Sequence, residues 1–204
     1  IGVDVSEHQG DIDWQAVADA GVEFVMLRVG YRGMTQGLLN ADATFAQNYE
    51  EARAAGLQVG AYFFSQAITD AEAQAEADFA VETLDGRELD YPLVFDWEPP
   101  LPSEELPAED LRAYAMTGEE ITGFAKAFSQ RVEELGYIPC VYTNKHMAYN
   151  TFNLTELNEY DLWYAEYQPV PSLYYHFRMW QYTASGTVPG ISGDVDINIC
   201  FDPY

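Results

Sequence analysis

The chain has 204 residues, 48% of them hydrophobic and 15% aromatic, which suits one sizeable core and excludes a disordered chain. Thirty-four acidic residues against nine basic ones give a net charge of -25 at pH 7. Because nucleic-acid binding depends on Lys and Arg, this charge argues against DNA, RNA and anionic membranes as partners. No apolar stretch approaches the roughly 20 residues that span a bilayer, so we expect one domain over residues 1–204 and no membrane insertion. Solubility alone explains the charge most simply.

Short β-branched and aromatic runs alternate with helical stretches through the first 150 residues. The predicted strands are residues 1–5, 24–29, 59–64, 93–97 and 139–143. The predicted helices are residues 14–20, 45–55, 70–84 and 117–135, with a short helical turn after Asn144. Several of the strands are continuously apolar, as expected of a parallel sheet covered on both faces.

The pattern changes after residue 161, where residues 162–165, 179–182 and 195–199 read as strands without convincing helices between them. Roughly eight strands, with helices only after the earlier ones, predict an α/β fold: a TIM-like barrel that lacks its last helices. An open doubly wound sheet is the alternative.

The cysteines and histidines argue against metal, redox and cofactor chemistry. Cys140 and Cys200 have no CxxC spacing, and His8, His146 and His176 are scattered. We therefore expect no metal site and no cofactor. The two cysteines form either one disulfide or two buried thiols, and their strand-like apolar surroundings favour thiols.

Two carboxylates stand at the end of the fourth predicted strand. Asp96 and Glu98 are two residues apart, so both point into the barrel, with Cβ atoms roughly 6 to 7 Å apart. Two like charges this close in an apolar interior raise the pKa of at least one group, which can then act as a general acid. Alternatively, the two acids form ion pairs with Arg28, the one obvious inward-facing cation.

Two further acids favour catalysis over a structural role. By strand alternation Asp4 also faces inward at the end of the first strand, and Asp196 does so on the last strand, which neighbours the first in a closed barrel. Burying unpaired charge costs several kcal/mol, and one Arg cannot neutralise four carboxylates. The sequence therefore predicts catalytic acids at one rim.

Aromatic side chains are predicted around the same rim, where sugar rings could stack on them. Each could equally be a core residue. Phe95 and Trp97 have the opposite parity to the acids and should pack against helices. The rim candidates are Tyr62, Phe64, Trp163, Tyr167, Trp180 and Tyr182.

Together these residues resemble the family 25 glycoside hydrolases, lysozymes of the Chalaropsis and phage-endolysin type. No single motif is specific, but their order and spacing are, and they run nearly end to end. The matching motifs are Gly2-Val3-Asp4-Val5-Ser6, Ile12-Asp13-Trp14, Asp96-Trp97-Glu98, Trp163-Tyr164-Ala165-Glu166-Tyr167, Trp180-Gln181-Tyr182 and Val195-Asp196-Ile197-Asn198. One departure is Trp97, where the family often has an aliphatic residue.

The resemblance implies a (β/α)5β3 barrel that cuts the β-1,4 bond between N-acetylmuramic acid and N-acetylglucosamine in peptidoglycan. It implies Glu98 as general acid and Asp96 as nucleophile or as the carboxylate that positions the substrate's acetamido group. Asp4 and Asp196 would tune charge and hold the sugar, and Tyr62 would support the transition state. Arg28 and the rim aromatics would bind substrate.

Two other functions stay open at this point: a glycan-binding module without turnover, and a divalent-cation site made by the four acids. For the hydrolase we expect peptidoglycan glycan strands as partners, a monomer, and an extracellular or wall-associated location. The first residue, Ile1, permits a signal peptide that has been removed.

Overall fold

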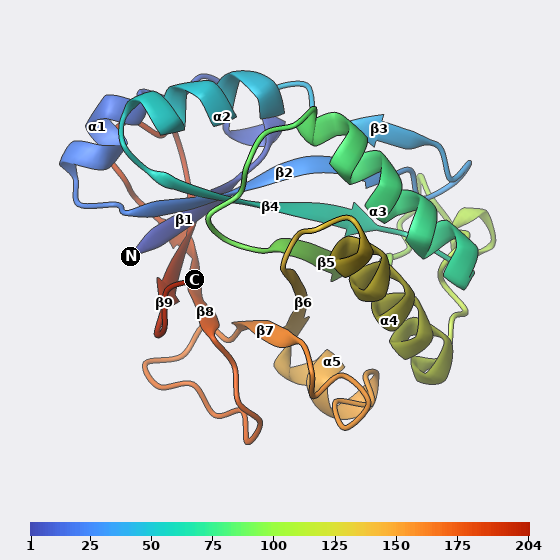
Figure 1. Ribbon diagram of the computed structural model, residues 1–204. Coiled ribbons are helices and arrows are strands. Elements are labelled where there is room, and N and C mark those ends of the chain that lie inside the picture. The colour runs from blue at the N-terminus through green and yellow to red at the C-terminus, as the bar shows by residue number, and fades with distance from the viewer.

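The computed structural model describes all 204 residues, and its first three quarters repeat a strand-helix unit five times (Figure 1). The five units are β1 (Gly2–Val5) with α1 (Trp14–Asp19), β2 (Phe24–Arg32) with α2 (Phe45–Ala54), β4 (Gln58–Ser65) with α3 (Asp70–Leu84), β5 (Leu93–Trp97) with α4 (Gly118–Glu134), and β6 (Pro139–Asn144) with α5 (Lys145–Asn150). A short strand, β3 (Leu39–Ala41), pairs antiparallel with the end of β2. Single 3-10 turns, η1 (Glu7–Gln9) and η2 (Ala108–Asp110), lie in two of the loops.

The last three strands, β7 (Asp161–Ala165), β8 (Met179–Gly186) and β9 (Val195–Cys200), follow without helices. β7 and β8 continue the parallel order, whereas β9 runs antiparallel to both β8 and β1. β1 also pairs with β2, so eight strands close into a barrel with β3 as an appendage. The predicted (β/α)5β3 barrel is confirmed, and the open doubly wound sheet is wrong.

Helix boundaries follow local side-chain chemistry. Thr69 begins α3 by accepting a hydrogen bond from the backbone of Glu72, and Thr117 with Glu120 forms a capping box at the start of α4. After α4 the chain turns at Gly136, whose φ of 87° disfavours any residue with a side chain. These signals explain why the helix predictions fall within a few residues of the observed ends.

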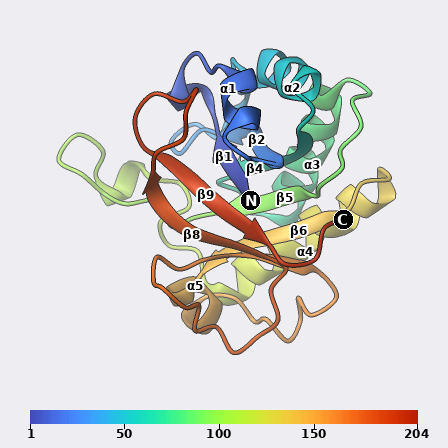
Figure 2. The same cartoon turned by 90° about the vertical axis from the view of Figure 1, so that its left-hand side faces the viewer.

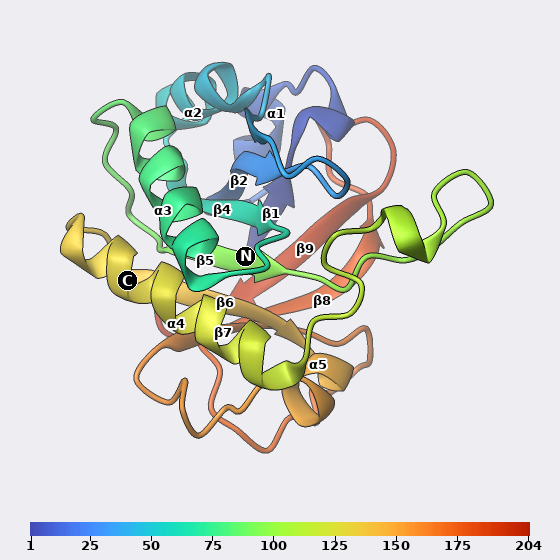
Figure 3. The same cartoon turned by 90° about the vertical axis from the view of Figure 1, so that its right-hand side faces the viewer.

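The barrel has two apolar layers. A cluster of 45 buried residues, the outer cluster, lies largely between the strands and the surrounding helices. A second cluster of nine buried residues, including Met26, Val94 and Cys140, fills the barrel interior. The helices cover one side (Figure 3), while β8 and β9 form a side without helices (Figure 2). Both cysteines are free thiols, as the sequence favoured, with Cys140 buried and Cys200 partly exposed.

No helix is both long and apolar enough to cross a bilayer. The longest loop, between β5 and α4, projects from the body of the molecule (Figure 3). It begins at Glu98, so its anchoring matters for the site.

Candidate active site

A cleft of about 310 Å³ opens at the carboxyl ends of the parallel strands, and all four acids singled out from the sequence line it. Asp96 is the penultimate residue of β5, and Glu98 follows that strand directly. Asp4 is the penultimate residue of β1, and Asp196 lies opposite it on the antiparallel strand β9. Because β9 runs in reverse, its start meets the same rim as the end of β1.

The four acids differ in how deeply they are buried in the cleft. Asp4 and Asp96 are each only 6% exposed, whereas Glu98 and Asp196 are half-buried and closer to solvent. Burial therefore acts most strongly on the inner two, and the outer two are the more accessible to a bound molecule.

Burial raises the pKa of every carboxyl group in this cluster. The pKa of Asp96 is raised well above its usual range, first by burial and then by the charges of Glu98 and Asp4. The pKa of Asp4 is likewise raised by burial and by Asp196, although hydrogen bonds from amide side chains oppose this. Burial and the charge of Asp196 raise the pKa of Glu98, and burial raises that of Asp196. The carboxyl groups of the cluster therefore ionise less readily than free carboxylic acids do.

Arg28 lines the cleft but does not neutralise these acids. Its guanidinium donates hydrogen bonds to Asp42 at 2.8 Å and to Glu7 at 3.0 Å. Its charge nevertheless offsets part of the rise in the pKa of Asp96. The alternative in which Arg28 forms ion pairs with Asp96 and Glu98 is wrong, because its guanidinium is paired with Glu7, after β1, and with Asp42, after β3.

Four of the predicted aromatic residues also line the cleft, namely Tyr62, Phe64, Trp163 and Tyr167. The Trp163 ring meets Tyr62 edge-on, with ring centroids 5.8 Å apart. Phe95 and Trp97 pack in the outer cluster, on the side predicted for them.

Trp180 does not lie in the cleft, so its predicted place on the rim is wrong. It packs in the outer cluster, where its indole donates to the backbone oxygen of Glu166 at 2.9 Å. Tyr182 packs against the same cluster. On β8 the inward positions belong to Met179 and Gln181, so Trp180 points outward.

The sequence prediction missed two buried amides that hold Asp4. Gln181 and Asn198 donate to the same oxygen, Oδ2 of Asp4, at 3.0 and 2.8 Å. The Asn198 oxygen accepts from the Trp163 indole at 2.7 Å, and the Gln181 oxygen accepts from the hydroxyls of Tyr142 and Tyr167. Asn198 could have been found, because it stands two residues after Asp196 and shares its face.

No three of the His, Cys, Asp and Glu side chains are arranged as metal ligands. The hypothesis of a divalent-cation site therefore gains no support from the geometry of the four acids. What the arrangement can do is donate and accept protons beside a ligand that stacks on aromatic rings.

A glycoside hydrolase is the class that this barrel and its acid cluster define, and sequence comparison gives the family. The sequence model of glycosyl hydrolases family 25 matches residues 3–191, so the chain belongs to that family. The chain is 30% identical over 97% of its length to the autolytic lysozyme of Clostridium acetobutylicum, and spans 54% of that protein. It is 32% identical to the uncharacterized protein YegX of Escherichia coli O6:H1, spanning 68% of it.

Solved structures show the same fold. The CTP1L endolysin superposes with a TM-score of 0.79 at 27% identity, covering 98% of this chain and 66% of the endolysin chain. The bacterial lysozyme of Streptomyces coelicolor superposes with a TM-score of 0.73 at 25% identity, covering 99% of this chain and 92% of that one. The chain therefore spans about half of one curated relative and nearly all of one solved structure.

Proposed function

We propose that this chain is a muramidase, which hydrolyses the β-1,4 bond between N-acetylmuramic acid and N-acetylglucosamine in bacterial peptidoglycan. The observation that carries the proposal is the set of four acids that line one aromatic cleft of a family 25 barrel. Relatives named autolytic lysozyme and lysozyme M1 support the substrate. The enzyme then works outside the cell or at the wall, as a monomer, with its activity contained in residues 1–204.

Glu98 is the general acid in this proposal. It is half-buried at the cleft, and burial together with Asp196 raises its pKa. As the bond between the sugar's anomeric carbon and the bridging oxygen breaks, the electron pair moves to that oxygen. The oxygen then takes the proton from Glu98, and the alcohol leaves.

Asp96 is the second carboxylate, and it acts on the anomeric carbon in one of two ways. Either its oxygen attacks that carbon, or it orients the substrate's acetamido oxygen to do so. In both cases it must be ionised during the reaction. Burial and the charges of Glu98 and Asp4 raise its pKa and oppose this state, and the charge of Arg28 favours it.

Asp4 and Asp196 hold the sugar and set the charge felt by the reacting acids. Asp196 raises the pKa of Glu98, which favours the protonated general acid, whereas Asp4 raises the pKa of Asp96 and so opposes its ionisation. Burial, with the charges of Asp4 and Asp96, raises the pKa of Tyr62 well above its usual range, so Tyr62 stays a neutral phenol whose hydroxyl can donate a hydrogen bond to a substrate oxygen in the transition state. The cleft aromatics provide faces for sugar rings.

The experiment that tests the proposal combines the substitution Glu98→Gln with product analysis. Wild-type protein should release fragments from purified peptidoglycan with muramic acid at the new reducing end, as read by mass spectrometry. The variant should lose about a thousandfold or more of this activity while keeping its circular dichroism spectrum. The control, Glu159→Gln, changes an exposed glutamate and should retain full activity.

Other outcomes identify other functions. A glucosamine reducing end would contradict the assigned bond. Saturable binding of glycan strands without any new reducing ends would show a glycan-binding module instead of an enzyme.

A further inference from the structure

The turn after β4 and the end of β5 hold each other by two hydrogen bonds. The Gln66 side chain donates from Nε2 to the backbone oxygen of Glu98 at 2.8 Å. In the opposite direction, the Trp97 indole donates to the backbone oxygen of Ala67 at 3.3 Å. The last ladder pair between the strands is Ser65 with Trp97, so these contacts extend the pairing past the end of the sheet.

The orientation of the Gln66 amide is fixed by its partners. Its nitrogen also donates to the backbone oxygen of Ser65 at 3.0 Å, and both partners are carbonyl oxygens that can only accept. Its own oxygen, Oε1, is therefore buried without a donor. An unpaired buried acceptor weakens a fold, so stability alone does not explain this fully buried glutamine.

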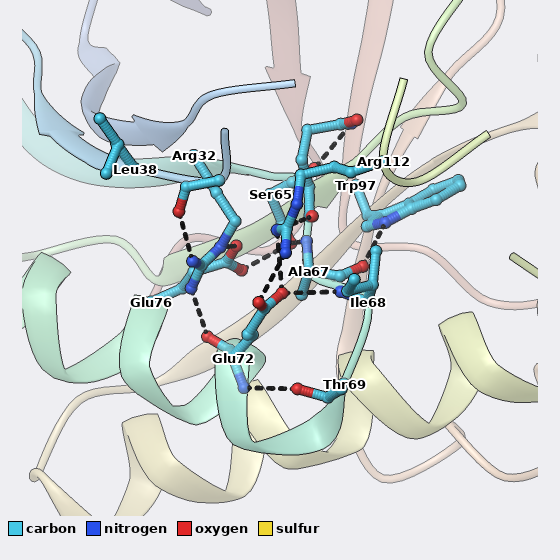
Figure 4. A network of polar contacts seen from close by, with 12 residues as sticks. Arg32, Leu38, Ser65, Ala67, Ile68, Thr69, Glu72, Glu76, Trp97 and Arg112 are labelled. Carbon is cyan, nitrogen blue, oxygen red and sulfur yellow. Dashed lines mark hydrogen bonds and ion pairs between the residues drawn. The ribbon is translucent and has the colours of Figure 1, made fainter. Parts of the chain in front are cut away.

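A second layer holds the turn itself. Arg112, from the loop between β5 and α4, donates to the backbone oxygen of Gln66 at 3.0 Å. The same guanidinium binds both carboxylate oxygens of Glu72, at 2.6 and 2.9 Å, and Glu72 accepts from the backbone of Ile68 (Figure 4). Arg112 therefore connects the turn after β4 and the start of α3 with the loop that begins at Glu98.

A third contact anchors the start of the turn to α3. Ser65 donates to Glu76 at 2.6 Å and accepts from the backbone of Ala67. Glu76, which is fully buried, is paired with Arg32 at 2.6 Å (Figure 4). The turn that contacts Glu98 is thus held by α3, β2 and the loop from β5 to α4.

The Glu98 carboxyl group, by contrast, receives no hydrogen bond from the protein. Only burial and the charge of Asp196 act on its pKa. Its position is consequently set by its own main chain, and the side-chain contact to that main chain comes from Gln66.

We propose that Gln66 is a positioning residue for Glu98, and that the Arg112–Glu72 pair holds Gln66 in place. The catalytic meaning of this assignment rests on the proposed function, in which Glu98 donates the proton. A displacement of about 1 Å at such a group can reduce turnover by up to about a hundredfold.

The test is Gln66→Met, which keeps the shape of the side chain and removes both its donor and its unpaired oxygen. We expect kcat to fall about tenfold with KM within about twofold, and a lower melting temperature, because the backbone oxygens of Ser65 and Glu98 lose the Gln66 donor. A less firmly held Glu98 is better solvated, so its pKa should fall toward the usual range in a carbon-13 NMR titration. The basic limb of the pH-rate profile should then move to lower pH.

A second variant, Arg112→Lys, loses bidentate binding and should shift the Glu98 pKa in the same direction by a smaller amount.

The matched control is Thr122→Val on α4, which also removes a buried hydrogen-bonding group by an isosteric change. Its hydroxyl donates to Gly118 at 2.7 Å and accepts from Asn153 at 3.0 Å, so the variant should melt earlier without any change in kcat or in the Glu98 pKa. An unchanged Glu98 pKa and kcat in Gln66→Met would overturn the positioning role. If wild-type protein released no reducing ends, the proposed function would be wrong, and the NMR titration would still decide whether Gln66 controls the environment of Glu98.

Discussion

The carboxyl groups on the two sides of the cleft differ in their hydrogen bonds. On the side of β1 and β9, Asp4 accepts two short hydrogen bonds from buried amides. On the side of β5, Asp96 has a buried oxygen, Oδ1, with no partner, and the Glu98 carboxyl group has no hydrogen bond either. Hydrogen bonds to a carboxylate stabilise its charge, whereas a bare buried carboxyl favours its proton. The pKa of Asp4 is still raised by burial and by Asp196, so the two sides differ in that amide donors oppose protonation of Asp4, whereas no hydrogen bond opposes protonation of Asp96 or Glu98.

The largest effect on activity is expected from Asp96→Asn, on the β5 side, where the carboxyl groups lack hydrogen bonds. The amide cannot attack the anomeric carbon or carry the charge that orients an acetamido group, so kcat should fall about a thousandfold or more. Release of reducing ends from peptidoglycan measures this loss. Activity within tenfold of wild type would remove Asp96 from the mechanism.

The same variant should be more stable than wild type at neutral pH. The folded state raises the pKa of Asp96, so the stability that its protonated form contributes is complete below the usual pKa and is lost as pH rises through the raised value. Asparagine does not titrate. Its melting temperature should exceed that of wild type by a few degrees at pH 7, a difference of about 1 kcal/mol or more. The gap should close as pH falls toward 3, which a series of thermal melts would show.

Much of this site follows from strand periodicity, which succeeds where one face is clearly polar. Asp96 in β5 and Glu98 directly after it face the cleft, with Phe95 and Trp97 on the opposite face, so their direction was predictable. On β8 apolar residues occupy both faces, and Trp180 was therefore assigned to the wrong side.

Other features depend on contacts that no local pattern contains. Gln66 acts on a main-chain oxygen 32 residues away, and Arg112 binds Glu72 across 40 residues. The β2 prediction ended at residue 29, whereas the strand passes a register shift between Arg28 and Gly30 and runs on to pair with β3. Such irregularities are set by closure of the barrel and the packing of its loops.

An intermediate effect is expected from Gln181→Met on the hydrogen-bonded side. The substitution removes one of the two donors to Asp4 and so makes that carboxyl more like Asp96. Because amide donors stabilise the ionised form, the pKa of Asp4 should rise further, and the acidic limb of the pH-rate profile should move to higher pH. We expect kcat to fall about tenfold. An acidic limb that does not move, with the exposed variant Gln74→Met as control, would show that the amide donors do not control the ionisation of Asp4.

The smallest effect on activity is expected from Trp180→Phe, outside the cleft. Its indole bonds the backbone of Glu166 and packs in the outer cluster, so the variant should lose about 1 to 2 kcal/mol of stability while kcat and KM stay within about twofold of wild type. Trp163→Phe is the matched variant within the cleft, where the lost indole donor leaves the Asn198 oxygen unpaired beside Asp4. Thermal melts and kinetics on both variants separate the two roles. If Trp180→Phe instead raised KM as much as Trp163→Phe, the substrate would have to reach beyond the cleft to the outer face of β8.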